Sequence, residues 1–238
     1  FCGKLLADYG AEVIKVEPLT GDPHRNRGTV MPNEGKRFQS LNRGKQSVAV
    51  NLRDPRGLAF IHKVVQTVDI VTINFRPGVS KRLGIDYETI RKFNPGIVYG
   101  SISGFGQDGP YRDRPGLDQI AQGLGGHMSV TGAPGEGPMR SGAAISDMTA
   151  GLLCANGILI ALLGRERSGE GQWVNTSLLE AQIFLLDFQA ARWLVDREVP
   201  PQAGNDHPTN VPMGVFKTRD GFINIAPMGH MWANVCTV

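Results

Sequence analysis

Two aspartates are candidates for chemistry because each stands at the start of a predicted helix. Asp147 follows Gly142-Ala143-Ala144 and precedes a long apolar run, and Asp118 opens a shorter helical segment. A carboxylate is favoured in its ionised form at a helix N-terminus, where it can act as a nucleophile. An aspartate in that position can equally well cap the free amides of its helix. Asp147 is therefore either a cap or a nucleophile, and Asp118 is a weaker candidate for the same two roles.

The other motifs exclude several classes of site. Residues 104–109 match the GxGxxG pattern after a predicted strand, but Pro110 and Pro115 forbid the helix that a dinucleotide site requires there. We interpret this segment as a glycine-rich turn. The five histidines have no metal-ligand spacing, and the sequence has no nucleophile-elbow or Walker motif. We therefore expect no metal site.

Composition indicates a folded protein, with 41% hydrophobic and 20% charged residues in a chain of 238. The apolar run at 150–163 is shorter than the roughly 20 residues that cross a bilayer, so we expect a buried helix and no membrane partner. Three cysteines, odd in number and widely spaced, predict neither a disulfide framework nor a zinc site and fit a reducing, cytoplasmic location. The chain begins with Phe1, and it is expected to be truncated at both ends.

Charge divides unevenly along the chain. Residues 1–115 hold 18 basic and 11 acidic side chains, a net charge of +7, whereas residues 116–238 hold 7 and 11, a net charge of −4. A basic first half either attracts an anionic ligand such as a phosphorylated small molecule or is an ordinary solvated surface. Nucleic acid is disfavoured because the basic residues are dispersed, without an arginine-rich helix.

Hydrophobic periodicity predicts an α/β fold in the first half of the chain. Apolar strands alternate with helical segments, which is typical of a parallel sheet. Asp54-Pro55 marks the start of a helix that runs to about Thr67. The expected strands are 12–17, 47–52, 69–74, 97–103 and 172–176, with a polar loop at 18–46 and further helices at 79–93, 118–124, 146–167 and 178–196.

A change in composition predicts a domain boundary near residue 198. Residues 199–212 carry four prolines and read as a linker, and 214–217 with 222–226 form a plausible hairpin. We expect a large domain over 1–198, followed at 199–238 by the linker and the start of a small domain.

Five segments in order resemble one known family. They are LADYGAEVIKVE from Leu6, NFRPG from Asn74, RLG from Arg82, SISGFG from Ser101 and RSGEGQ from Arg167. Together they are similar to the family III (CaiB/BaiF) CoA-transferases, which include formyl-CoA transferase and, as a relative, 2-methylacyl-CoA racemase. The resemblance runs to about Trp232. It implies a Rossmann-like large domain with a parallel sheet, a small domain, and a homodimer of interlocked subunits.

The resemblance also implies an activity. The family's catalytic aspartate stands in a Gly-Ala-Ala-x-x-Asp segment, and Asp147 matches that position. In the family's reaction, CoA moves from an acyl-CoA donor to a small carboxylic acid. The aspartate forms first an aspartyl anhydride and then an aspartyl-CoA thioester. CoA is then a substrate, and no permanently bound cofactor is expected. Asp118 remains a possible second carboxylate.

The same resemblance assigns the CoA contacts. Arg53 matches a basic residue near the nucleotide, Asn74 and Phe75 match the turn beside the adenine, and Arg82, next to Leu83, matches an arginine at the phosphates. A guanidinium suits phosphate because it donates hydrogen bonds in a planar fork. The alternative for each polar residue is an ordinary surface position.

Other functions stay open at this point. The racemase branch uses a histidine where this chain has Leu117, and leucine cannot carry a proton, so transfer is favoured. An inactive CoA-binding fragment would keep Arg53, Asn74 and Arg82 but would not need Asp147. Residues 200–212 lack the glycine run that closes over the site in formyl-CoA transferase, so a dicarboxylic or carnitine-like acceptor fits as well as oxalate or formate.

Overall fold

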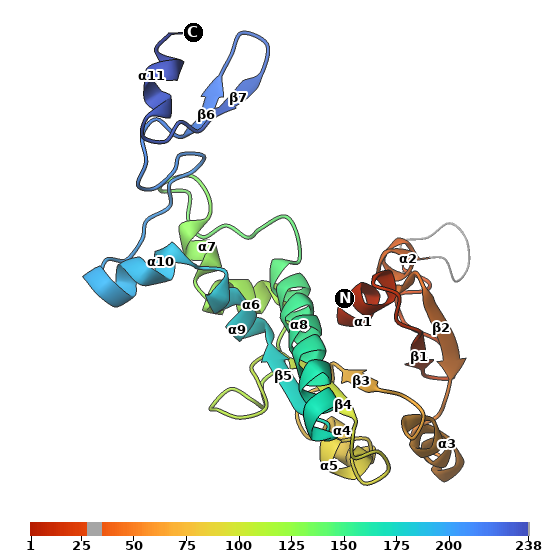
Figure 1. The fold of residues 1–238 in the computed structure, drawn as a ribbon. Coiled ribbons are helices and arrows are strands. Elements are labelled where there is room, and N and C mark those ends of the chain that lie inside the picture. The colour runs from red at the N-terminus through yellow and green to blue at the C-terminus, as the bar shows by residue number, and fades with distance from the viewer. Residues whose placement is uncertain (28–34, 238) are drawn as a thin grey trace. The chain divides into compact units, whose positions relative to one another are not determined.

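The computed structural model describes residues 1–27 and 35–237 (Figure 1). These residues form two compact units, one of residues 1–118 and 145–181 and the other of 119–144 with the chain from 182 onward. Neither unit ends at residue 198, so the division into 1–198 and 199–238 stays a prediction. Residues 28–34 of the predicted polar loop lie outside the described residues.

The first unit contains two parallel sheets. In one, β1 (Val13–Glu17) pairs with β2 (Lys45–Ala49); in the other, β4 (Val98–Ser103) lies between β3 (Ile70–Ile73) and β5 (Trp173–Ser177). The parallel pairing agrees with the predicted α/β class. The expectation of one sheet was wrong, because periodicity indicates which segments are strands but not which strands pair.

Helices connect these strands, and most lie where the sequence predicted them. The Asp54 side chain accepts a hydrogen bond from the Arg56 N–H (2.9 Å), so it caps the helix that begins at Pro55 as expected. One helix was missed because it lies inside the predicted polar loop, at Lys36–Asn42. The helices of this unit are α1 (Cys2–Asp8), α2 (Lys36–Asn42), α3 (Pro55–Val65), α4 (Val79–Arg82), α5 (Tyr87–Ile90) and α8 (Ile145–Ser168).

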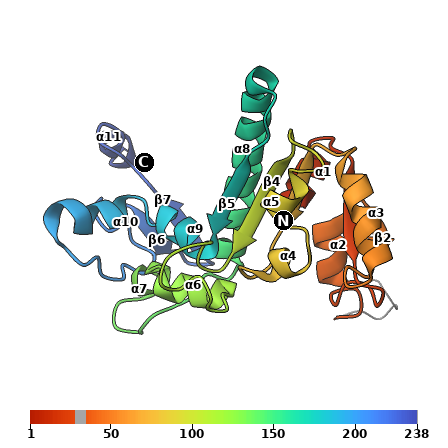
Figure 2. The ribbon, with the colours of Figure 1, turned by 90° about the horizontal axis from the view of Figure 1, so that it is seen from below.

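Strand β4 is buried on both faces and organises the core. On one face Val98 packs with Cys154 and Ile158 of α8, and on the other Tyr99 packs with residues of α3 and α5. Gly100 lets α8 approach closely, since a Cβ there would lie 2.7 Å from Ile158 Cδ1. Figure 2 shows α8 running beside β4 and β5.

Helix α8 is longer than the apolar run that predicted it, with 24 residues. By length and composition alone it could cross a membrane. However, seven of its residues are buried, and it packs against β4 and β5. The helix therefore belongs to the core of the unit, as the sequence predicted.

The three cysteines are free thiols in the structure. Cys2 and Cys154 are both buried in the core cluster between α1 and α8, whereas Cys236 is exposed. Their wide separation in the sequence did not predict this proximity.

The second unit is mostly helical and carries the predicted hairpin. Asp187, at φ 46°, interrupts the single helix expected over 178–196. The hairpin turn closes through the Thr218 N–H, which donates to the Gly221 carbonyl (2.9 Å). Two helices, α6 (Asp118–Leu124) and α9 (Leu178–Phe184), begin in the first unit and continue into the second. The other elements of the second unit are α7 (His127–Val130), α10 (Phe188–Ala191), the π-helix η1 (Arg192–Asp196), β6 (Gly214–Lys217), β7 (Phe222–Ile225) and α11 (Met231–Val235).

Candidate active site

The N-terminus of α8 brings the two candidate aspartates together. Asp118 Oδ1 accepts hydrogen bonds from the backbone N–H groups of Ser146 (2.9 Å) and Asp147 (3.4 Å). The first amides of α8 thus find their acceptor on a residue almost 30 positions earlier in the chain. Asp118, the first residue of α6, therefore caps a different helix, α8.

This arrangement separates the two roles that the sequence left open for Asp147. Because Asp118 caps the helix, the carboxylate of Asp147 in the first turn is not needed for that purpose. The Asp147 side chain is 39% exposed, and its recorded ion-pair partner in the described chain is Arg37, at 3.9 Å between Nη2 and Oδ2. The Asp147 carboxylate is therefore accessible from solvent.

Asp147 lies at the edge of the sheet where the strands end. The Thr176 hydroxyl, near the end of β5, donates to the carbonyl of Ala150 (3.3 Å), one turn after Asp147. Helix α8 runs antiparallel to the strands, so its N-terminus meets their carboxyl ends. Ligands of open parallel sheets bind at this edge.

The electrostatic environment raises the pKa of Asp147 above its ordinary value of 3.8. Burial of the carboxyl group is the largest cause, and the negative charge of Asp118 acts in the same direction. The Arg37 guanidinium opposes them. A helix N-terminus alone predicted a carboxylate that stays ionised, and this expectation overlooked burial and the neighbouring charge. Because its pKa is raised, the ionised carboxylate of Asp147 is a stronger base than an ordinary aspartate.

Arg37 is the residue near this site that sequence reasoning missed. It lies on α2, within a segment predicted to be loop, and 110 positions before Asp147. No spacing rule connects two residues so far apart. The excess of basic residues in the first half was the one signal in the sequence, and it did not single out Arg37.

A pocket away from Asp147 holds three of the predicted CoA contacts. Arg53, Arg82 and Leu83 line one pocket of about 440 Å³ where α3 begins and α4 ends. Lys81 lines it too, although the sequence did not suggest it. Among the described residues, no carboxylate pairs with Arg53, Lys81 or Arg82. The pocket is lined by Leu52, Arg53, Pro55, Leu58, Lys81, Arg82, Leu83 and Gly84.

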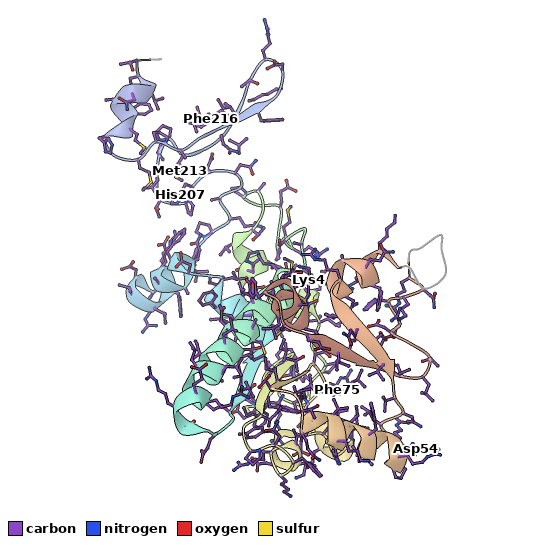
Figure 3. All side chains as sticks on the ribbon, turned by 45° about the vertical axis from the view of Figure 1, so that its right-hand side comes forward. Lys4, Asp54, Phe75, His207, Met213 and Phe216 are labelled. Atoms are coloured by element: carbon purple, nitrogen blue, oxygen red, sulfur yellow. The ribbon has the colours of Figure 1, made fainter. Side chains whose placement is uncertain are left out.

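Asn74 and Phe75 do not line this pocket. They follow β3 directly, so they stand at the carboxyl end of that strand. Asn74 is exposed, while Phe75 packs against the core cluster that contains residues of α3 and β4. Figure 3 labels Phe75, together with Asp54 at the start of α3.

The glycine-rich segment after β4 is a turn, as predicted. Gly104 packs against the backbone of Gly116, because a Cβ on Gly104 would lie 2.5 Å from Gly116 Cα. No helix starts between these glycines. Within residues 1–27 and 35–237, no three His, Cys, Asp or Glu side chains are grouped as a metal site.

The protein is thus of the parallel α/β class. It has an accessible carboxylate at a helix N-terminus, beside the carboxyl ends of the strands, and a separate cationic pocket. The chain belongs to CoA-transferase family III, whose model matches residues 1–238. This membership agrees with the resemblance found in the five sequence segments.

Named relatives support the same family. The chain is 41% identical over 234 residues to a succinate–glutarate CoA-transferase of Agrobacterium fabrum, covering 95% of this chain and 58% of the relative. It is 39% identical to succinyl-CoA:glutarate CoA-transferase of Mus musculus (98% and 54% covered) and 37% identical to acetyl-CoA:oxalate CoA-transferase of Acetobacter aceti (98% and 61%). The chain thus spans little more than half the length of these relatives.

Solved structures agree with the fold. A CaiB/BaiF family protein from Brucella suis superposes with a TM-score of 0.90 at 35% identity, covering 99% of this chain and 64% of the other. Rv3272 from Mycobacterium tuberculosis superposes with a TM-score of 0.87 at 30% identity, covering 99% and 63%.

Proposed function

We propose that the whole protein is an acyl-CoA:carboxylate CoA-transferase and that this chain carries its nucleophile and its CoA pocket. One observation carries the proposal: Asp118 caps α8, which leaves the Asp147 carboxylate accessible beside a guanidinium. A structural carboxylate in the first turn would instead be engaged with the helix amides.

In the proposed reaction, Asp147 attacks the thioester carbonyl of the donor acyl-CoA. A bond forms between the aspartyl oxygen and the acyl carbon, the C–S bond breaks, and CoA leaves as a thiolate. The thiolate then attacks the Asp147 carbonyl of this anhydride and releases the donor acid, leaving an aspartyl-CoA thioester. The acceptor carboxylate reverses the two steps and departs as the new acyl-CoA. Covalent intermediates conserve the thioester energy that water would dissipate.

CoA would be held at two separate places along its length. Arg53, Lys81 and Arg82 offer the phosphorylated nucleotide three cations that pair with no carboxylate among the described residues, and the thiol end reaches Asp147. CoA suits this division because its phosphates and its thiol are at opposite ends of a long molecule. Asn74 and Phe75, at the end of β3, are proposed to lie along its path.

We further propose that the acid partner is a small dicarboxylic acid. The names of several relatives refer to succinate, glutarate or oxalate, all of which carry two carboxylates. The racemase alternative is not favoured, because Leu117 offers no proton-carrying group. The homodimer implied by the family resemblance remains a prediction.

Acyl exchange with the full-length protein tests this function. Each acyl-CoA in a panel is mixed with each free acid, and the new acyl-CoA is measured by chromatography. We expect exchange to be fastest with dicarboxylic donors and acceptors. Binding of CoA without exchange for any pair would instead identify a CoA-binding protein.

A further inference from the structure

Arg37 stands out because it places a positive charge at the proposed reacting centre without belonging to the CoA pocket. Its Nη2 atom lies 3.9 Å from Asp147 Oδ2, and its side chain is 58% exposed. A guanidinium has five N–H donors in a planar fork. Among the described residues this one contact, at 3.9 Å, leaves most of these donors available to a ligand.

The helix that carries Arg37 is held firmly at its start. The Gly35 N–H donates to the Arg25 carbonyl (2.6 Å), and a Cβ on Gly35 would lie 1.9 Å from the His24 carbonyl oxygen. Only glycine therefore fits at position 35, directly before α2. This close packing fixes the entry of the chain into α2, two residues before Arg37.

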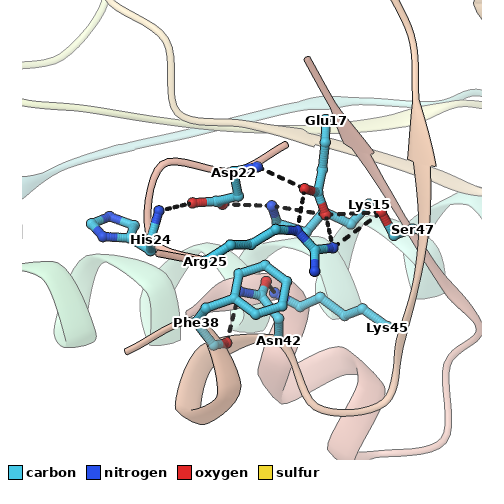
Figure 4. A network of polar contacts seen from close by, with 9 residues as sticks. All are labelled: Lys15, Glu17, Asp22, His24, Arg25, Phe38, Asn42, Lys45 and Ser47. Carbon is cyan, nitrogen blue, oxygen red and sulfur yellow. Dashed lines mark hydrogen bonds and ion pairs between the residues drawn. The ribbon is translucent and has the colours of Figure 1, made fainter. Parts of the chain in front are cut away.

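A second contact holds α2 one residue after Arg37. The Arg25 guanidinium stacks 4.0 Å from the centre of the Phe38 ring. Arg25 is itself held by Glu17 through hydrogen bonds of 2.8 Å and 2.7 Å, and Glu17 is buried at the end of β1 (Figure 4). The orientation of α2, and with it the position of Arg37, is thus tied to the first sheet.

The charge at Asp147 changes during the proposed reaction, and this gives Arg37 a role. Free Asp147 is the counter-ion of Arg37, but the anhydride and the aspartyl-CoA thioester are both neutral at this residue. Arg37 then remains beside the reacting carbonyl after losing Asp147 as its counter-ion. The acceptor acid must bring its carboxylate to that same carbonyl, and charge-assisted hydrogen bonds to a guanidinium are the strong ones.

We propose that Arg37 binds the reacting carboxylate of the acid substrate beside Asp147, and that the Arg25–Phe38 contact positions it. This inference rests on the proposed function. It assigns Arg37 to the acid that attacks or leaves, whether that acid has one carboxylate or two, and not to CoA.

The test measures how an acid and a neutral nucleophile discharge the preformed aspartyl-CoA thioester of the full-length protein. Single turnovers are followed by the formation of new acyl-CoA with added carboxylic acid and by the release of free CoA with hydroxylamine. In Arg37→Met we expect the second-order rate with acid to fall by about tenfold or more, as for loss of a charge-assisted hydrogen bond. The rate with hydroxylamine should stay within about twofold of wild type, because this nucleophile has no charge to be held.

Matched variants separate a charge effect from a local one. Lys36→Met removes one positive charge from the same helix at the neighbouring position and should leave both rates unchanged. Arg37→Lys should recover part of the rate with acid, and Phe38→Leu should lower that rate alone. Equal rates for Arg37→Met and Lys36→Met would overturn the inference, as would a loss seen only with dicarboxylic acids, which would place Arg37 at the distal carboxylate. A wild-type protein that forms no thioester would refute the proposed function itself.

Discussion

Asp118 caps the helix that carries Asp147: its Oδ1 accepts hydrogen bonds from the backbone N–H of Ser146 at 2.9 Å and of Asp147 at 3.4 Å. One carboxylate thus performs the structural task at the start of α8, and the other is left accessible. The two aspartates also repel each other, which contributes to the raised pKa of Asp147. Their separate roles make separate predictions.

Asp118 should matter for stability. We expect Asp118→Ala to lower the free energy of unfolding by about 1 kcal/mol, because the first amides of α8 lose their acceptor. Asp118→Asn should cost much less, since asparagine caps about as well as aspartate. Chemical denaturation measures both. Asp113→Ala, which removes an exposed carboxylate paired with Arg112, is the control and should have little effect. Equal losses for Asp118→Ala and Asp113→Ala would contradict the capping role.

Asp147 should matter for chemistry. Asp147→Asn keeps the shape of the side chain, and Asp118 still caps the helix, so the variant should fold with near-normal stability. An amide cannot form the anhydride, so we expect acyl exchange to fall by about a thousandfold or more, as for loss of a covalent nucleophile. Hydroxylamine added during turnover of the wild type should leave a hydroxamate that mass spectrometry locates at Asp147. A hydroxamate on Asp118 would identify Asp118 as the nucleophile in place of Asp147.

The pH dependence of exchange should report the neighbours of Asp147. Its pKa is raised by burial and by Asp118 and lowered by Arg37, so the acid limb of kcat/KM should lie above the ordinary value of 3.8. Asp118→Asn should move this limb to lower pH, and Arg37→Met should move it to higher pH. Shifts in the opposite directions would mean that another group controls the limb.

The same raised pKa has a consequence for folding. Unfolded Asp147 ionises near pH 3.8, while folded Asp147 holds its proton to a higher pH, so its contribution to stability is fully present below 3.8 and is lost as pH rises through the folded pKa. Asp147→Asn never ionises. Relative to wild type, the variant should therefore be more stable at pH 7 than at pH 3, which thermal unfolding at the two pH values measures. A relative stability independent of pH would contradict the raised pKa.

The pocket of Arg53 and Arg82 should recognise phosphate. Arg53→Ala and Arg82→Ala should each weaken CoA binding about tenfold, as for loss of a charge-assisted hydrogen bond, and affect pantetheine little. Added salt should shrink the loss, because it screens the long-range part of the attraction. Arg91→Ala removes an exposed arginine that is paired with Glu88 and does not line the pocket, and it serves as the control in calorimetric titration. Equal weakening for CoA and pantetheine would refute the phosphate assignment.

The carbon next to the thioester should keep its proton. Leu117 stands where the racemase branch has a histidine, and leucine offers no base. Either enantiomer of a 2-methylacyl-CoA incubated in heavy water should therefore remain unlabelled by mass spectrometry. Rapid deuterium incorporation with inversion would move the protein to the racemase branch.

The sequence by itself determined the local elements of this protein. Asp54-Pro55 set the start of α3, and apolar periodicity located the strands, the long helix α8 and the hairpin, because caps and burial patterns act over a few residues. The five ordered segments also identified the family. The position of Asp147 before an apolar helix predicted it as a candidate, but the sequence could not separate a cap from a nucleophile.

Only the tertiary structure decided which distant residues surround that aspartate. The cap on α8 comes from Asp118 and the cation from Arg37, and neither distance follows a helical or strand period. The raised pKa of Asp147 depends on burial and on Asp118, both of which arise only when the chain has folded. Likewise, Arg53 and Arg82 share a pocket because α3 lies against the turn that follows α4. Electrostatic and ligand-binding interactions act through space, whereas sequence patterns report what is close along the chain.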